Sequence, residues 1–343
     1  MNKEDLYSPT VNSEFVRLIL AISLECDCSI STFDVAGGFL TAEYDEEEFG
    51  PLYVKIPSNL EEVLKDRPDL IPRLPNGRIA KYAKVKRSLY GARASTLIFY
   101  IKYRDFITKP ESEGGPGFIQ SKIDPCCFYK RGNQGDGTTN GITQEPSMEN
   151  MKHSFGLVSA HVDDALLSFS NDQEGRRMRK DFEDKLFNEF NASPEESSGD
   201  QIEYLSLLVQ INRERGSMTF KVPKLLIKLK QMLEEIKNCR GVHPKGGKLK
   251  YPLDPYSKDI FEETSEDNPI VPYSEYDSRS ILGLAAYIVL HTRPDCAYAA
   301  AVCARFSGCR NTKKVTEAVN HLAWYLIDTA EDHIFTFWKT DAI

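Results

Sequence analysis

The feature that most constrains the fold of this 343-residue chain is a pair of adjacent aspartates, Asp163 and Asp164, between two apolar runs. Residues 156–162 precede the pair and residues 165–170 follow it, and both runs are rich in β-prone side chains. Two such runs separated by two residues are typical of a tight hairpin. We therefore expect both carboxylates to occupy the turn, where their repulsion is costly unless a cation lies between them.

A third carboxylate that could share such a cation is Asp34, which lies at the end of an extended stretch and shortly before a pair of glycines. Glycines have no side chain and let a ligand approach the backbone closely. Three carboxylates on neighbouring strands are the means by which a polymerase palm holds two divalent ions about 4 Å apart for in-line phosphoryl transfer. The sequence therefore predicts a site for two Mg²⁺ or Mn²⁺ ions at Asp34, Asp163 and Asp164.

Both segments resemble the reverse transcriptases of copia-type long-terminal-repeat retrotransposons, which are part of a Pol polyprotein. That family carries an Asp-Val-x-x-Ala-Phe-Leu segment and a Tyr-Val-Asp-Asp hairpin. This chain reads Asp-Val-Ala-Gly-Gly-Phe-Leu from residue 34 and His-Val-Asp-Asp from residue 161. Further segments similar to family motifs follow the family's order: Glu-Asp-Leu-Tyr-Ser-Pro at 4–9, Lys-Arg-Ser-Leu-Tyr-Gly at 86–91, Asp-Pro-Cys-Cys-Phe at 124–128, Tyr-Leu-Ser at 204–206 and Thr-Arg-Pro-Asp at 292–295. An ordered series spanning nearly the whole chain is not expected by chance.

The resemblance implies a role for each residue of the site. Asp34 and Asp163 would bind both metal ions with Asp164 assisting, and the backbone of Val35 would complete the metal site. Phe39 would lie under the sugar of the incoming nucleotide and exclude a 2′-hydroxyl group. The other nucleotide-binding residues would be Tyr90, Gly91 and Arg93.

The resemblance also implies an α+β, right-hand polymerase fold. Its palm would be an antiparallel sheet backed by helices, with partial fingers, a helical thumb and a helical connection region. We expect partial fingers and palm over residues 1–198, a thumb-like hairpin and basic helix over 199–250, and a linker with the connection region over 251–343. The chain would then lack part of the fingers at its N-terminus and end before an RNase H domain.

Hydrophobic periodicity agrees with this organisation. It predicts helices at residues 14–25, 93–108, 176–190 and 223–237, and three helical pieces within 278–329. It predicts strands at the segment that bears Asp34, at 126–130 and 155–162, and a hairpin of 204–211 with 217–222. The proline- and glycine-rich residues 109–118 are expected to be a loop, and the polar residues 131–152 are expected to lack order.

Composition and hydropathy limit the class of protein to which this chain can belong. The chain is 41% hydrophobic and 27% charged, which is typical of a soluble globular protein. Its apolar run at 15–24 is short of the about 20 residues that span a bilayer, and no signal-peptide pattern is present. We expect an intracellular protein, in the cytoplasm or nucleus, that is not secreted and has no membrane partner. The sequence does not indicate its oligomeric state.

The expected partners are an RNA or DNA primer–template, dNTPs and the rest of a Pol polyprotein. The net charge of −8 argues against a polyanionic partner. However, residues 221–250 contain nine lysines or arginines and residues 81–93 contain five, so two basic regions could contact phosphates.

Departures from the family pattern bear on activity. The chain has Gly38 where the family has Ala, Ala94 for Gln, Thr96 for Pro and Ser206 for Gly. Because small displacements of reacting groups can cost about 100-fold in rate, these changes predict reduced or lost activity of the isolated chain. Three functions stay open: an RNA-directed DNA polymerase, a catalytically silent retroelement remnant that still binds nucleic acid, and an unrelated metal-binding or scaffold protein.

Overall fold

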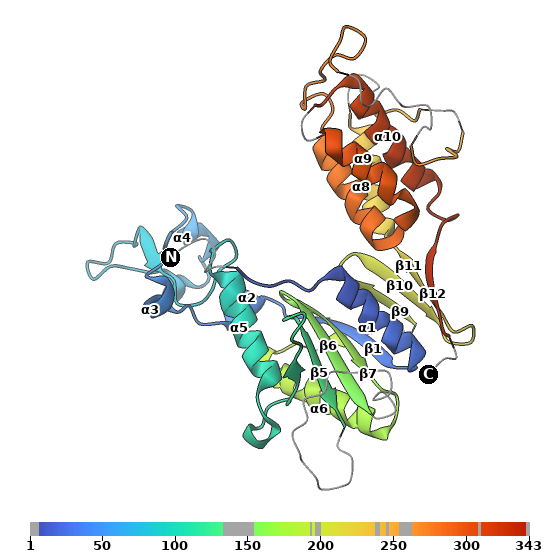
Figure 1. The fold of residues 1–343 in the computed structure, drawn as a ribbon. Helices are drawn as coiled ribbons and strands as arrows, with labels where there is room; N and C mark the ends of the chain where they lie inside the picture. The colour runs from blue at the N-terminus through green and yellow to red at the C-terminus, as the bar shows by residue number, and fades with distance from the viewer. Residues whose placement is uncertain are drawn as a thin grey trace. The chain divides into compact units, whose positions relative to one another are not determined.

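The computed structural model describes residues 7–132, 154–192, 194–195, 200–236, 241–244, 247–253, 263–307 and 310–340. The chain divides into two compact units, Met1–Glu195 and Glu196–Ile343, which we call the first and second units (Figure 1). Most of the segment predicted to lack order, residues 131–152, lies outside the described residues. Within the described part of the chain, no helix is both long and apolar enough to cross a lipid bilayer.

The first unit is built on a six-stranded antiparallel sheet. Its strands lie in the order β4-β5-β6-β7-β1-β8. They are β1 (Ser29–Asp34), β4 (Ile119–Gln120), β5 (Cys127–Arg131), β6 (Phe155–His161), β7 (Asp164–Phe169) and β8 (Pro194–Glu195). The β6–β7 hairpin therefore lies beside β1, although β1 is far from it in the sequence.

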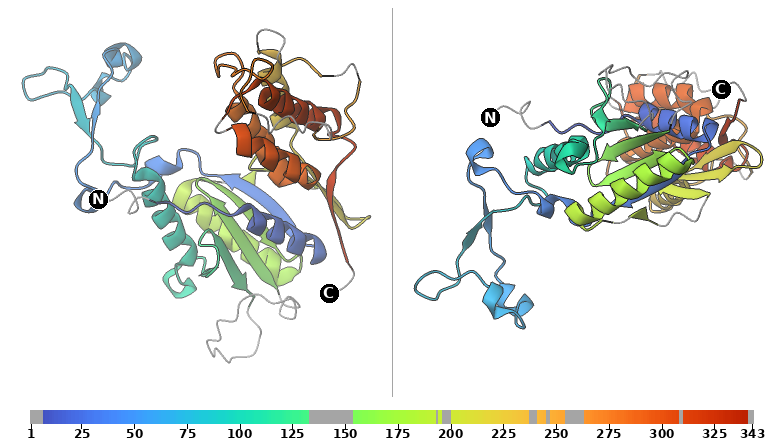
Figure 2. Two further views of the ribbon diagram at one scale, coloured as in Figure 1. Left: turned by 45° about the horizontal axis from the view of Figure 1, so that its top comes forward. Right: turned by 90° about the horizontal axis from the view of Figure 1, so that it is seen from below.

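Helices α1 (Ser13–Glu25) and α6 (Gln173–Phe190) cover opposite faces of this sheet, as both views of Figure 2 show. The buried residues of α6 recur every four positions from Met178 to Phe190, which places them on one helical face. They share a core cluster with Phe99 and Tyr103 of α5 (Ser95–Thr108). The three helices confirm the predictions at 14–25, 93–108 and 176–190 to within one turn.

The packing of α1 shows which residues of β7 project from each face. The Ser23 hydroxyl of α1 lies 2.6 Å from the Ser168 hydroxyl of β7. Leu167 and Phe169 belong instead to the core cluster under α6. Because successive side chains of a strand point to opposite faces, Asp164 lies on the same face as Ser168, the face that α1 covers.

Residues between β1 and α5 form a second, smaller sheet and several short helices. Strands β2 (Tyr53–Lys55) and β3 (Tyr82–Lys84) pair antiparallel. The short helices are α2 (Gly38–Thr41), α3 (Glu46–Phe49) and α4 (Leu60–Val63), with a 3-10 turn η2 at Pro68–Leu70. This region lies within residues 1–198, over which partial fingers and palm were expected together.

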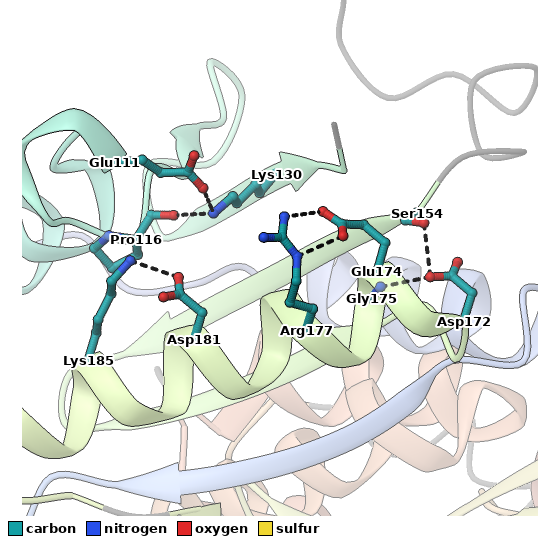
Figure 3. Close-up of polar contacts among 10 residues, drawn as sticks. All are labelled: Glu111, Pro116, Lys130, Ser154, Asp172, Glu174, Gly175, Arg177, Asp181 and Lys185. Carbon is teal, nitrogen blue, oxygen red and sulfur yellow. Dashed lines mark hydrogen bonds and ion pairs between the residues drawn. The ribbon is translucent and has the colours of Figure 1, made fainter. Parts of the chain in front are cut away.

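The predicted loop after α5 is attached to the rest of the first unit by two lysines, Lys130 and Lys185. Figure 3 shows the contacts of Lys130 with this loop. Lys130 of β5 donates to the Pro116 carbonyl at 2.6 Å and forms an ion pair with Glu111, in the 3-10 turn η3 (Glu111–Glu113). Lys185 of α6 donates to the Gly115 carbonyl at 2.9 Å. The loop thereby connects two elements that are distant in sequence.

The second unit consists of a four-stranded antiparallel sheet, in the order β12-β11-β10-β9, and a helical bundle. Its strands are β9 (Gln201–Tyr204), β10 (Leu207–Asn212), β11 (Ser217–Lys221) and β12 (Phe335–Trp338), and its helices are α7 (Pro223–Glu234), α8 (Ser278–Thr292), α9 (Ala297–Ser307) and α10 (Lys313–Asp328), with the 3-10 turn η6 at Pro294–Cys296. The segment 204–211 is not one strand, because Leu205 and Ser206 form a turn with φ angles of 49° and 66°. Helix α7 confirms the helix predicted at 223–237 as far as Glu234, and residue 237 lies outside the described residues. Helices α8, α9 and α10 confirm the three predicted within 278–329.

The predicted division at residue 250 is not a boundary between units. Helix α7 packs against α8 and α10, and β12 returns to pair with β11. The expected thumb and connection region therefore share one core. Sequence patterns could not show this, because both contacts join segments far apart in the chain.

Candidate functional site

The β6–β7 hairpin places the acidic pair at one end of the large sheet. β6 ends at His161, β7 begins at Asp164, and these residues are Cα partners, so the turn consists of Val162 and Asp163. The expectation that both aspartates occupy the turn is thus wrong by one residue. Both strands are buried on both faces. No alternation of apolar and polar residues therefore marked the register in the sequence.

Val162 has a strained backbone in this turn. Its φ of 58° lies in the left-handed region, which β-branched residues avoid. Two-residue hairpin turns usually meet this requirement with glycine or asparagine. The turn is also tied to β1, since the Asp163 carbonyl accepts a 3.0 Å hydrogen bond from the Val35 N–H.

Asp34, the last residue of β1, is the Cα partner of Asp164. Directly opposite residues of an antiparallel pair project from the same face, so the two carboxylates are neighbours. Asp34 is exposed, whereas Asp163 and Asp164 are half-buried. The fold thus brings the three predicted carboxylates to one end of the sheet.

The donor chemistry of this group fits a divalent metal ion. Carboxylate oxygens are ligands that Mg²⁺ and Mn²⁺ prefer. Among the described residues, however, no three His, Cys, Asp or Glu side chains converge closely enough to hold an ion. The Val35 carbonyl, the predicted backbone ligand, accepts a 2.8 Å hydrogen bond from the Gly38 N–H and keeps a second lone pair. The groups that could hold an ion here are the carboxylates of Asp34, Asp163 and Asp164 and the Val35 carbonyl.

Tyr90 lies against these carboxylates. Its hydroxyl is 3.5 Å from Asp163 Oδ2, and its ring centroid is 4.5 Å from that of Phe39. Burial raises the pKa of the Tyr90 hydroxyl, and the negative charges of Asp163 and Asp34 raise it further. The hydroxyl therefore stays protonated and donates to Asp163.

Phe39 and Phe99 form the apolar floor beside the aspartates. Phe39 is only 8% exposed, and its ring meets Phe99 of α5 edge-on at 5.8 Å. A Cβ atom at Gly38 would lie 3.0 Å from Phe99 Cζ and 3.4 Å from Asp163 Cβ, so glycine permits this close approach. Sequence analysis placed Phe99 on a helix but missed its contact with the site.

Gly91 and Arg93, two of the predicted nucleotide-binding residues, lie between Tyr90 and the start of α5. Gly91 has φ of 87° and is exposed, and Arg93 is exposed just before α5. No hydrogen bond or ion pair joins Arg93 to the aspartates in the described structure. Its predicted phosphate contact therefore stays a prediction.

His161 replaces the tyrosine of the family pattern at the end of β6. Its Nδ1 is buried and has no hydrogen-bond partner. Burial lowers the pKa of its imidazole, and the nearby Asp163 charge opposes this shift. His161 is therefore neutral at pH 7 and adds no positive charge to the site.

The basic regions are partly neutralised by acids of the same unit. The ion pairs are Lys84–Glu46, Lys221–Glu331, Lys224–Glu203, Lys230–Glu234 and Lys248–Asp332. Exposed pairs of this kind are weak, so phosphates could compete for the lysines. Three further basic residues of 221–250, Lys237, Arg240 and Lys245, lie outside the described residues.

The chain is similar over most of its length to retrotransposon Pol polyproteins. It is 25% identical over 339 residues to the retrovirus-related Pol polyprotein from transposon TNT 1-94 of Nicotiana tabacum, which covers 96% of this chain and 21% of that relative. Two Saccharomyces cerevisiae relatives are each 23% identical over 85% of this chain. They are the truncated transposon Ty1-A and the transposon Ty1-DR1 Gag-Pol polyproteins, of which the chain covers 20% and 14%.

The chain thus spans about a fifth or less of the length of the curated relatives it matches. No family model matches it, and no solved structure matches it significantly. The similarity supports a retroelement origin for this chain.

Proposed function

We propose that this chain is a reverse-transcriptase unit, an RNA-directed DNA polymerase with a right-hand fold, from a retroelement Pol polyprotein. The observation that carries the proposal is the meeting of Asp34, Asp163 and Asp164 at one end of an antiparallel sheet backed by helices. The similarity to retrotransposon Pol polyproteins over 96% of the chain supports it. That similarity also weighs against an unrelated scaffold protein.

In this proposal Asp34 and Asp163 would be the main residues that hold two Mg²⁺ or Mn²⁺ ions, and Asp164 would assist. When bound, the ions would lower the pKa of the primer hydroxyl and neutralise the leaving pyrophosphate. Phe39 supports the sugar of the incoming dNTP from below. Tyr90 and Gly91 line the nucleotide site, and Arg93 contacts a phosphate.

The second unit supplies the template-binding surface in this proposal. Helix α7 has buried Leu229 and Leu233 on one side, and it carries Lys224, Lys228 and Lys230 among its other positions. An amphipathic basic helix of this kind can lie along the phosphates of a primer–template. Its lysines would exchange their intramolecular ion pairs for phosphate contacts.

A second candidate, a silent remnant that still binds nucleic acid, is favoured by one observation. The chain carries Gly38, Ala94, Thr96 and Ser206 where the family pattern has Ala, Gln, Pro and Gly. Loss of catalytic geometry with retention of the basic helix would leave salt-sensitive binding without polymerisation.

Primer extension separates these two candidates. The full chain is incubated with an RNA or DNA template, a primer, dNTPs and Mg²⁺ or Mn²⁺. The test variant is Asp163→Asn with Asp164→Asn, and the matched control is Asp105→Asn with Asp184→Asn, which removes two exposed charges elsewhere in the first unit. The proposal predicts extension by the native and control chains, at the reduced rate that the departures from the family pattern imply, and none by the test variant.

Two other results of this experiment would contradict the proposal. Extension that persists in the test variant would overturn the proposed roles of the aspartates. No extension by any chain, with primer–template binding that falls steeply as salt rises, would favour the remnant.

A further inference from the structure

Tyr90 contacts two parts of the candidate site at once. Its hydroxyl makes a long hydrogen bond of 3.5 Å to Asp163 Oδ2, and its ring lies on Phe39 with the planes 54° apart. The side chain is nevertheless 58% exposed, so the core does not hold it in place. One movement of this side chain would uncover both the carboxylate and the Phe39 ring.

The backbone around Tyr90 is suited to such a movement. Gly91 follows it with φ of 87° and has open space where a Cβ would lie. A glycine in this conformation permits a change of direction without steric cost. On the other side, the Leu89 N–H is anchored to Ser95 Oγ at 3.1 Å, at the start of α5. Tyr90 therefore stands between an anchored residue and a permissive one.

On the basis of the proposed function, we propose that Tyr90 is a positioning residue that covers Asp163 in the empty site and moves aside when a divalent cation binds. An ion that approaches Asp163 Oδ2 from the side of the hydroxyl would take the place of this hydrogen bond. Both Asp163 and Asp34 bear electrostatically on the hydroxyl, which agrees with its place over the site.

The proposal predicts that the hydroxyl competes with the cation. Tyr90→Phe removes the hydroxyl and keeps the ring on Phe39. For a long, exposed hydrogen bond to a charged group, we expect this change to tighten cation binding by about threefold to tenfold. A side chain with a merely structural role would leave cation affinity unchanged or lower it.

Mn²⁺ binding tests this directly and does not depend on polymerase activity. Free Mn²⁺ is measured by electron paramagnetic resonance during titration of the full chain. Tyr82→Phe is the matched control, because Tyr82 of β3 is 62% exposed and removing its hydroxyl changes the same group. Asp163→Asn reports binding at the site. Thermal unfolding without ions checks that every variant folds.

We expect Tyr90→Phe to bind Mn²⁺ more tightly than the native chain, Tyr82→Phe to match the native chain, and Asp163→Asn to bind more weakly. Equal affinity in the native and Tyr90→Phe chains would overturn the role of Tyr90 and leave the proposed function standing. Absence of Mn²⁺ binding in both would overturn both proposals. If Tyr90→Phe binds Mn²⁺ and the native chain does not, the result would support the proposed competition between the hydroxyl and the cation.

Discussion

Asp34 and Asp164 are Cα partners on adjacent antiparallel strands, so two carboxylates face each other at the end of the large sheet. Like charges directly opposite each other destabilise a strand pair. The neighbouring turn adds a second cost, because Val162 takes a left-handed conformation with φ of 58°. Local costs concentrated at one position are typical of functional sites, where other requirements outweigh stability.

Asp34→Asn should therefore stabilise the metal-free protein while weakening cation binding. We expect a gain of about 0.5 kcal/mol in the free energy of unfolding, because the opposite-strand repulsion is removed. Mn²⁺ should raise the unfolding temperature of the native chain, since a ligand that binds the folded state stabilises it. The unfolding temperature of Asp34→Asn should rise less when Mn²⁺ is added. Asp184→Asn on α6 is the control, and a variant that gains as much from Mn²⁺ as the native chain would contradict the prediction.

Gly38→Ala, which restores the residue of the family pattern, should destabilise this chain. The new Cβ would lie 3.0 Å from Phe99 Cζ, and overpacking of this kind costs about 1 kcal/mol. In a Phe99→Leu background, Gly38→Ala should cost less than it does in the native chain, because the clashing ring is gone. Gly283→Ala is the control, because Gly283 is exposed in α8 with open space around it, and a gain of about 0.5–1 kcal/mol is expected there. Urea unfolding of each variant measures the differences. A Gly38→Ala chain at least as stable as the native one would show that Phe99 yields without cost.

The helices were the part of the fold that the sequence predicted best. The buried residues of α6 recur at four-residue spacing from Met178 to Phe190, and this periodicity is local information. The same holds for α7, where Leu229 and Leu233 are buried. Predicted ends differ by a few residues because helix ends depend on capping and on neighbouring elements.

The hairpin turns were predicted less well, for a physical reason. Val162, Leu205 and Ser206 all have positive φ, a conformation that their residue types rarely adopt. Local propensity therefore pointed away from the turns that tertiary pairing imposes. For the site, the three aspartates could be predicted from the motifs. The position of Phe99 could not, because it depends on a contact with Gly38 that only the folded chain creates.

Ser206→Gly should stabilise the second unit. Ser206 has φ of 66°, and the left-handed conformation costs about 1–2 kcal/mol for a residue with a Cβ. Glycine lowers stability through chain entropy by about 0.5–1 kcal/mol, so a net gain of about 0.5 kcal/mol is expected. The Tyr287 hydroxyl still holds the turn through its 2.9 Å bond to the Leu205 carbonyl. The exposed Ser274, whose φ is not positive, is the control, and Ser274→Gly should lose stability. Chemical denaturation measures the free energy of unfolding of both variants. A lower value for Ser206→Gly as well as for Ser274→Gly would contradict the strain proposed at Ser206.

The tripeptide Arg-Pro-Asp occurs twice in this chain, in two different environments. Arg293 donates to Asp295 through Nε at 2.9 Å and Nη2 at 2.8 Å, and its side chain is only 4% exposed. Arg67 donates to Asp69 in the same way at 3.1 and 2.9 Å, but both side chains are more than 60% exposed. The second pair is therefore an internal control for the first.

Asp295→Asn should destabilise the protein by about 2 kcal/mol, because it leaves the buried Arg293 guanidinium without its charged partner. This is below the range for fully buried pairs, since Asp295 is 37% exposed. Asp69→Asn should produce no measurable change. Thermal unfolding at pH 7 compares them, and equal losses at both positions would contradict the role of burial.

The Asp295 pair should also make stability depend on pH. Burial alone would raise the pKa of Asp295, but the hydrogen bonds and charge of Arg293 outweigh it and lower the pKa below its usual value. A depressed folded-state pKa means that the contribution is complete above the unfolded value of about 3.9 and is lost as pH falls through the folded pKa. Unfolding of the native chain and of Asp295→Asn is measured from pH 6 downward. Their difference in stability should shrink in acid, and a constant difference would contradict this assignment.

Lys130 and Arg177 lie close together in Figure 3, but their ion pairs should differ in importance. Lys130 is 11% exposed and connects β5 to the loop through Glu111 and the Pro116 carbonyl. Arg177 is 68% exposed and pairs with Glu174 one turn away on α6. Lys130→Met should cost about 1–2 kcal/mol, because a buried carbonyl loses its donor. Arg177→Met should cost little or nothing, as expected for an exposed pair within one helix. Urea unfolding tests the contrast, and limited proteolysis within 109–117 should be faster only in Lys130→Met. Equal effects of the two substitutions would show that the loop is held by other contacts.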